Sequence, residues 1–198
     1  MTKLNEVKKH LRPGQVYRRR DLEYFSNAVD RHLKQLQAEG TLTKLSGGLY
    51  HCPKKTAFGE APADDKTLVE GFLKDNRFLL SSPNAYNALG VGTTQLYNET
   101  VVYNHKRHGR ENLGGRVFDF RSKPHFPKAL SEEFLLVDLV NNVDRLAEDR
   151  EELLGRVKTR AAEMDQRALA NAVSNYGSGR AKRFFSVALP GRASTHAT

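Results

Sequence analysis

Between residues 27 and 38, amide and cationic side chains recur every three or four positions. Asn27, Arg31 and Lys34 fall on one face of a helix with 3.6 residues per turn, and Gln35 lies beside them. Amide and guanidinium groups can form paired hydrogen bonds with base edges, and an ammonium group is attracted to phosphate. The spacing therefore predicts a helix face that can bind a nucleic acid.

The opposite face of this helix is apolar, which gives it a buried side. Val29, Leu33 and Leu36 are spaced by four and three residues and form one stripe. Ser26 and Asn27 supply short polar side chains that can cap the first turn. Gly40 is the residue type that ends helices. We therefore expect a helix over residues 27–39.

The segments around this helix predict a helix-turn-helix followed by a hairpin. An opening helix ends at Pro13-Gly14, a short strand is expected at Val16-Tyr17, and a brief helix spans residues 19–25. Residues 41–45 and 49–52 are prone to form strands, and Ser46-Gly47-Gly48 between them suits a tight turn. This order is typical of a winged helix, in which the second helix enters the major groove of double-stranded DNA.

The candidate contacts with DNA lie on the second helix, on the hairpin and in the basic runs beside them. They are Arg18, Arg19, Arg20, Ser26, Asn27, Arg31, Lys34, Gln35, Lys44, Ser46, Gly47, Lys54 and Lys55. The alternative interpretation is a solvated surface helix and a common Gly-Gly turn. Local charge favours DNA, because residues 1–60 carry 12 Lys and Arg against 6 Asp and Glu, whereas residues 131–198 carry 10 of each.

Composition limits the remaining possibilities. The 198 residues can form one large or two small domains, and 38% hydrophobic with 28% charged residues is typical of a folded chain. The lone Cys52 excludes an intrachain disulfide and a Cys-based zinc finger. The N-terminus lacks the apolar core of a secretion signal, and no segment approaches the roughly 20 apolar residues that span a bilayer. We therefore expect a cytoplasmic protein without membrane partners.

A domain boundary is expected within residues 58–66, which are rich in Gly, Pro, Ala and acids. A helix capped by Asp65 or Thr67 should follow, and a short helix should begin at Pro83 and end at Gly90. Strands are predicted over residues 95–104 and 115–121, with a polar loop between them.

The C-terminal third is predicted to be helical. Ser131 has the position of an N-cap before a wide apolar face, and three more helices are expected over residues 150–164, 166–176 and 180–189. The predicted fold class is α+β: an N-terminal winged helix-turn-helix, a small mixed α/β unit and a C-terminal helical bundle. The predicted domains are 1–60 and 66–190, followed by a disordered tail over 191–198.

Two groups of residues in the middle region could do other chemistry. Asp119, with Glu99 or Glu111 nearby, offers carboxylates of the kind that hold Mg²⁺ in metal-dependent nucleases, or is one solvent-facing position of an alternating strand. His105 and His108 are three residues apart, but their polar, glycine-bearing surroundings favour a loop over a metal site. We predict no catalytic residues, metal or cofactor. The loop residues Lys106, Arg107 and Arg110 are candidates for contact with a partner or with phosphate.

Motifs in both predicted domains point to a known family. The predicted hairpin ends with Gly48-Leu49-Tyr50 followed by Pro53-Lys54, and the second domain contains Pro83, Ala88 to Gly90, Val101 to Tyr103 and Val117 to Arg121. In these motifs the chain resembles the antitoxins of the AbiE abortive-infection type, which are type IV toxin-antitoxin regulators. The resemblance covers about residues 5–190 and its motifs are structural. It implies a non-enzymatic DNA-binding antitoxin that represses its own operon and opposes a nucleotidyltransferase toxin encoded beside it.

The sequence is also compatible with two other functions. The chain could be a stand-alone winged-helix transcription factor whose second domain senses a ligand or dimerises. It could instead be the metal-dependent nuclease considered above. A nucleotidyltransferase reading frame next to the gene would favour the antitoxin over the stand-alone regulator.

Overall fold

The structure is a computed structural model that describes residues 2–91 and 96–188. It has an α+β fold that ends in a helical segment, and it divides into two compact units. The first unit comprises Met1–Arg77 and Arg110–Phe118, and the second comprises Phe78–Gly109 and Asp119–Thr198. Among the described residues, no helix has both the length and the apolar character needed to cross a bilayer.

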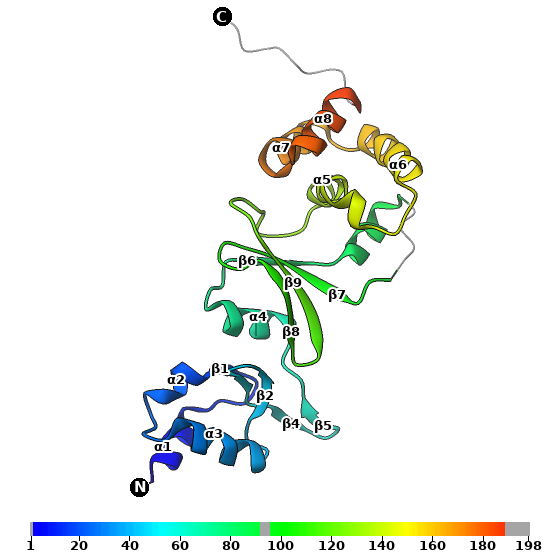
Figure 1. The fold of residues 1–198 in the computed structure, drawn as a ribbon. Helices are drawn as coiled ribbons and strands as arrows, with labels where there is room; N and C mark the ends of the chain where they lie inside the picture. The colour runs from blue at the N-terminus through cyan, green and yellow to red at the C-terminus, as the bar shows by residue number, and fades with distance from the viewer. Residues whose placement is uncertain (1, 92–95, 189–198) are drawn as a thin grey trace, which may run out of the picture. The chain divides into compact units, whose positions relative to one another are not determined.

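The first unit begins with three helices and a small sheet (Figure 1). The elements are α1 (Lys3–His10), β1 (Val16–Arg18), α2 (Arg19–Glu23), α3 (Val29–Ala38), β2 (Thr43–Ser46) and β3 (Leu49–His51). The strands form an antiparallel sheet in the order β1-β3-β2. All six elements were predicted in this order, and each observed bound lies within a few residues of the predicted one.

The core of this part is made by the predicted apolar stripe. Val29, Leu33 and Leu36 are buried together with residues of α1, α2 and the sheet. Gly40 ends α3 with a φ of +69°, which residues with a Cβ rarely adopt. The N–H of Gly40 donates to Gln37 O at 3.0 Å, and that of Thr41 donates to Leu36 O at 2.9 Å. These bonds satisfy carbonyl groups that the helix end leaves free.

A second hairpin follows the sheet where we predicted a linker. Strands β4 (Lys54–Thr56) and β5 (Gly59–Ala61) pair with each other alone. The side chain of Thr56 closes their turn, because its hydroxyl donates to Gly59 O at 2.7 Å and accepts from Phe58 N at 3.2 Å. The Pro- and acid-rich composition did not reveal this local closure.

Helix α4 (Asp65–Leu73) also belongs to the first unit. Its N-cap is Asp64, which accepts from Thr67 N at 2.9 Å, and not Asp65 or Thr67 as predicted. Arg18 Nε donates to Gly71 O at 3.2 Å and joins α4 to β1. The first unit extends to Arg77, whereas we expected a domain boundary within residues 58–66.

The larger sheet has the order β6-β7-β9-β8. Its strands are β6 (Phe78–Ser81), β7 (Glu99–Asn104), β8 (Gly109–Leu113) and β9 (Arg116–Ser122). The predicted loop between β7 and β9 is therefore wrong over residues 109–113, where Gly114 and Gly115 at positive φ let β8 turn back into β9. The predicted short helix is a 3₁₀ helix, η1 (Pro83–Leu89), capped by Ser82 and ended by Gly90.

The helices of the second unit are α5 (Glu132–Asn142), η2 (Val143–Arg145), α6 (Arg150–Glu163), α7 (Gln166–Tyr176) and α8 (Gly179–Ala188). Helix α5 lies among α6, α7 and α8, and its apolar residues form the centre of their core (Figure 1). Ser131 caps α5 and accepts from Phe134 N at 3.2 Å, as predicted. The four long helices are confirmed, and the predicted tail lies outside the described residues.

Candidate nucleic-acid interface

The start of α3 is held by a side-chain contact that the sequence did not predict. Ser26 Oγ accepts from Ala28 N at 3.1 Å and is hydrogen-bonded to His32 Nδ1 at 2.7 Å. The N-cap residue is Ala28, which makes no side-chain cap hydrogen bond, so α3 does not have the side-chain cap that we predicted at Ser26-Asn27. His32 is buried, and its hydrogen bond uses the hydroxyl that we expected to face DNA. Ser26 therefore orders the turn before α3.

The outer face of α3 remains open. Arg31, Lys34 and Gln35 on this face are exposed. Asn27 is also exposed, but it precedes the N-cap Ala28 and does not lie within the helix as predicted. Gln35 Nε2 donates to Glu39 Oε1 at 3.1 Å on the protein surface. Within the described part of the chain, the side chains of Asn27 and Arg31 have no hydrogen-bond or ion-pair partner. These two residues can donate to an external acceptor without breaking a bond of the fold.

The run Arg18-Arg19-Arg20 divides into three different environments. Arg18 is half-buried and bonded to Gly71, so it supports the fold and does not present a free cation. Arg19 donates to both carboxylate oxygens of Asp30, at 2.7 and 2.8 Å, and lies 3.3 Å from Glu23. Arg20 is exposed and, among the described residues, forms no ion pair. Of the three predicted phosphate contacts, only Arg20 is open.

Mutual hydrogen bonding shifts the pKa of both partners in the Arg19 and Asp30 pair. The bond from Arg19 lowers the pKa of the Asp30 carboxyl, and the same bond raises the pKa of Arg19. Both groups therefore stay charged at neutral pH. A shallow hollow of about 240 Å³ lies beside them, lined by Arg19, Glu23 and residues 26–31.

The hairpin β2–β3 carries the predicted wing residues. Lys44 and Gly47 are exposed, and Ser46 is half-buried beside a register shift between Lys44 and Ser46. Gly48, with a φ of +71°, accepts from Arg19 N at 2.8 Å. The turn of this hairpin is thereby fixed to the start of α2, whose Arg19 also binds Asp30 of α3.

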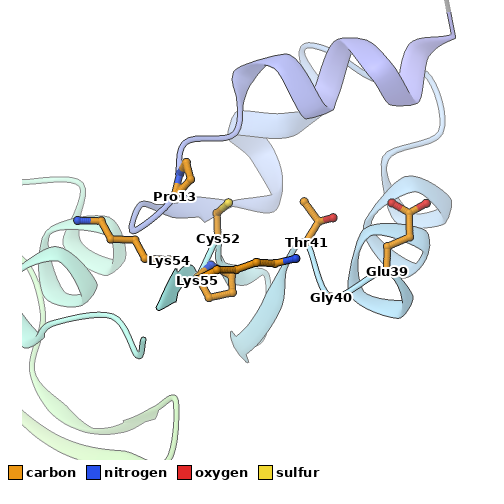
Figure 2. A pocket seen from close by; sticks show the side chains of 8 residues that line it. Pro13, Glu39, Gly40, Thr41, Cys52, Lys54 and Lys55 are labelled. Atoms are coloured by element: carbon orange, nitrogen blue, oxygen red, sulfur yellow. The ribbon is translucent and has the colours of Figure 1, made fainter. Parts of the chain in front are cut away.

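Lys54 and Lys55 belong to β4 of the separate second hairpin. The end of α3 and the start of β4 border a hollow of about 630 Å³, lined by Pro13, Glu39, Gly40, Thr41, Cys52, Pro53, Lys54 and Lys55. Figure 2 shows the side chain of Lys55 reaching across this hollow towards Thr41, whereas Lys54 points away. Burial raises the pKa of the Cys52 thiol, which keeps it protonated at neutral pH.

The basic loop before β8 is built by one buried amide. Asn104 Oδ1 accepts from the N–H groups of Lys106 and Arg107 at 2.8 and 2.7 Å, and Asn104 Nδ2 donates to Arg107 O at 3.0 Å. His105 stacks on Phe126 with ring centroids 4.6 Å apart. The loop histidines expected here are confirmed as loop residues. The sequence did not reveal the part played by Asn104.

The carboxylate proposed for a nuclease centre is part of an ion-pair cluster. Asp119 is buried, and its Oδ2 lies 2.7 Å from Arg121 and 3.3 Å from Arg145. The expectation that Asp119 faces solvent is therefore wrong. Within residues 2–91 and 96–188, no three or more His, Cys, Asp or Glu side chains are grouped so that they could hold a metal ion.

A second polar cluster surrounds Asp138 of α5. Tyr86 and Tyr103 donate to its carboxylate at 2.7 and 2.6 Å, and Asn142 Nδ2 donates at 3.0 Å. Burial raises the pKa of Asp138 and also that of Tyr103. An acid inside the apolar run Phe134 to Val140 was the only sequence signal for this cluster. Its polar groups bind one another and join α5 to η1 and β7.

Comparison with known proteins gives a fold relationship. No protein-family model matches the sequence, and the search of curated proteins found no match. Among solved structures, the chain is similar to the RV2827C protein from Mycobacterium tuberculosis. The alignment covers 95% of this chain and 74% of that chain, with a TM-score of 0.56 and 15% identity. At this level of identity, the similarity shows a shared fold and nothing more.

Proposed function

We propose that the first unit contains a winged helix-turn-helix and that the protein is a DNA-binding regulator. The order α1, β1, α2, α3, β2, β3 and the antiparallel sheet β1-β3-β2 support this assignment. In such a domain the second helix of the helix-turn-helix enters the major groove, and α3 has this position in the chain.

The observation that carries the proposal is the division of α3 into two chemically different faces. Val29, Leu33 and Leu36 fix one face in the core. Arg31 on the other face and Asn27 just before the helix are exposed and have no partner among the described residues. An exposed guanidinium on a helix that is itself rigidly anchored can bind guanine edges or phosphates at a defined position. The excess of cations over residues 1–60 adds attraction for any duplex.

The narrower proposal concerns the biological role. The resemblance to AbiE-type antitoxins supports a protein that represses its own operon and opposes a nucleotidyltransferase toxin. The second unit would then present the surface that meets the toxin. Co-expression of the chain with a nucleotidyltransferase encoded next to it should relieve growth arrest, and continued arrest would remove the antitoxin role while leaving DNA binding intact.

DNA binding is tested with the full-length protein, its own promoter fragment and a random duplex of equal length. Arg31→Ala and Asn27→Ala should lose discrimination between the two duplexes by about 1–3 kcal/mol, the usual value for a good base contact. Lys44→Ala should weaken binding to both duplexes equally. Lys158→Ala, an exposed change on α6, is the control and should alter neither. Absence of any binding by the wild type at low salt would overturn the proposal.

A further inference from the structure

The second hairpin carries the most exposed aromatic side chain of the described residues. Phe58, in the turn between β4 and β5, has a relative exposure of 102%. All three residues of β4 are exposed, and so are the first two of β5. A two-stranded hairpin with so little buried surface gains little stability from its own packing. The fold of the unit gives no reason for a phenylalanine at this tip.

The hairpin is nevertheless preorganised. Thr56 Oγ1 binds both Gly59 O and Phe58 N, and Gly59 adopts a φ of +110°. These bonds fix the backbone on both sides of Phe58 and present its ring to solvent. A ring held in this way loses little conformational freedom when it inserts into a partner.

The charge beside the ring indicates the class of partner. Lys54 and Lys55 are exposed, and in the part of the chain that the structure describes neither ammonium group has an ion-pair partner. The one acid of the hairpin, Glu60, is directed towards α3, because its Oε1 lies 3.8 Å from the position that a Cβ atom on Gly40 would occupy. A hairpin with an apolar ring at its tip and two cations on the strand that leads to the tip is complementary to a polyanion with an apolar interior.

Two hairpins of different chemistry lie at opposite ends of α3. The glycine turn of β2–β3 is bonded to Arg19, which holds Asp30 in the first turn of α3, whereas β4–β5 lies beside Gly40 at the other end. A helix of 10 residues is about 15 Å long, and the major groove is about 12 Å wide. With α3 in the groove, each hairpin can therefore reach the phosphates on one side.

From this arrangement, and resting on the proposed DNA binding, we propose that the β4–β5 hairpin is a second DNA-contacting element. Phe58 inserts between base pairs from the minor groove next to the major groove occupied by α3, and Lys54 and Lys55 bind the flanking phosphates. Apolar side chains inserted in this way unstack one base step and kink the duplex towards the major groove. The affinity for a DNA sequence then depends on how easily that sequence bends, as well as on the base contacts made by α3.

The test uses the full-length protein and the promoter fragment, trimmed to the protected segment that footprinting identifies. Fluorescence anisotropy measures the affinity for DNA. Energy transfer between dyes at the two DNA ends measures the bend, and permanganate oxidation of thymines detects the unstacked base step. Phe58→Ala should abolish the bend and the oxidised step, and weaken binding by roughly 5- to 100-fold. Phe58→Leu keeps an apolar wedge and should retain the bend.

The charged contacts have a different signature. Replacing both Lys54 and Lys55 with Ala should lower the slope of log affinity against log salt by roughly 1.8, because two phosphates are no longer neutralised. Val187→Ala, which removes an exposed apolar side chain from α8, is the matched control and should change neither affinity nor bend.

Several outcomes would overturn the inference. If Phe58→Ala leaves affinity and bending unchanged while Arg31→Ala still abolishes discrimination, the hairpin does not contact DNA and the proposed function stands. If Phe58→Ala changes only the oligomeric state measured by light scattering, the tip is a protein contact. If the wild type binds no DNA, the proposed function fails first, and this outcome is distinguishable from the other two.

Discussion

The guanidinium group of Arg19 binds both carboxylate oxygens of Asp30, at 2.7 and 2.8 Å, and so joins the first residue of α2 to the first turn of α3. The pair also keeps one negative and one positive charge at the beginning of the proposed recognition helix. Neither group is available to DNA while the pair is intact. The pair therefore limits the electrostatic attraction of this surface for phosphate.

Asp30→Asn should increase DNA affinity, because the change removes a negative charge and leaves Arg19 with only its longer contact to Glu23 at 3.3 Å. If Arg19 then contacts one phosphate, the salt dependence should become steeper by roughly 0.9 in log affinity per log salt. Arg19→Ala should have the opposite effect, since Asp30 would remain without its partner. Anisotropy titrations at several salt concentrations measure both, with Glu151→Gln on α6 as the control. An unchanged affinity for both variants would mean that this end of α3 lies away from DNA.

A combined change of Lys106, Arg107 and Arg110 to Ala should leave DNA affinity unchanged if the DNA surface is confined to α3 and the two hairpins. Asn104 binds the backbone N–H groups of Lys106 and Arg107, which the substitutions retain, and Arg110 lies in β8 and not in the loop as predicted. The measurement is the same titration with promoter DNA. A large loss of affinity would show that this loop is part of the DNA surface.

Substitution of Asp138 should have a large effect on stability. Asp138→Ala removes a buried acceptor of two tyrosine hydroxyls and should lower the free energy of unfolding by about 3–5 kcal/mol. Tyr103→Phe removes one hydrogen bond to the carboxylate and should cost about 1.5–3 kcal/mol. Urea denaturation followed by circular dichroism measures both, and Glu151→Ala is the exposed control. A loss below 1 kcal/mol for Asp138→Ala would contradict the buried network.

His51 should make stability depend on pH. Its Nε2 is buried and has no hydrogen-bond partner in the described part of the chain. Burial lowers the pKa of His51, Arg116 lowers it further, and Glu60 and Asp64 act in the opposite direction. Because the folded pKa lies below the ordinary value of about 6.5, the stability contributed by neutral His51 is complete above that pH. It is lost as the pH falls through the folded pKa.

The corresponding experiment measures the urea midpoint between pH 7.5 and pH 5. His51→Gln should flatten the decline at low pH, because glutamine does not titrate. His108→Gln, in the exposed loop, should leave the decline as it is in the wild type. Identical profiles for the wild type and His51→Gln would show that another group causes the acid sensitivity.

Features that depend on local sequence could be predicted. The stripe of Val29, Leu33 and Leu36 follows from helical periodicity, and Gly40, Ser131 and Gly90 mark helix ends through backbone conformation or capping. The open position of Arg31 follows from the same periodicity, since one face of a helix determines the other. Asn27 is exposed as expected, but it lies before the helix and not on its outer face. These are properties of a few adjacent residues.

Features that depend on distant residues could not be predicted. The pairing of Arg19 with Asp30 and the burial of Asp119 between two arginines require the tertiary structure. The β4–β5 hairpin was missed because its turn depends on one threonine hydroxyl and a single glycine, Gly59, and not on a Gly-rich run. The first unit also includes residues 110–118, which no composition shift in the sequence indicates.

Residues 110–118 are synthesised later than the rest of the first unit. Gly114 N donates to Leu45 O next to the register shift of the β2–β3 hairpin, and Arg116 binds Asp65, so the first unit is built from two separate stretches of chain. On the ribosome, about 40 residues must still be added after Arg77 before Phe118 exists, which takes roughly 2 to 8 s at ordinary translation rates. During this interval the nascent chain has α3 but lacks β8 and the start of β9, which belong to the same unit. The contacts of Gly114 with Leu45 and of Arg116 with Asp65 therefore form only after the middle of the protein has been synthesised, although the buried core around α3 lies within residues 7–52.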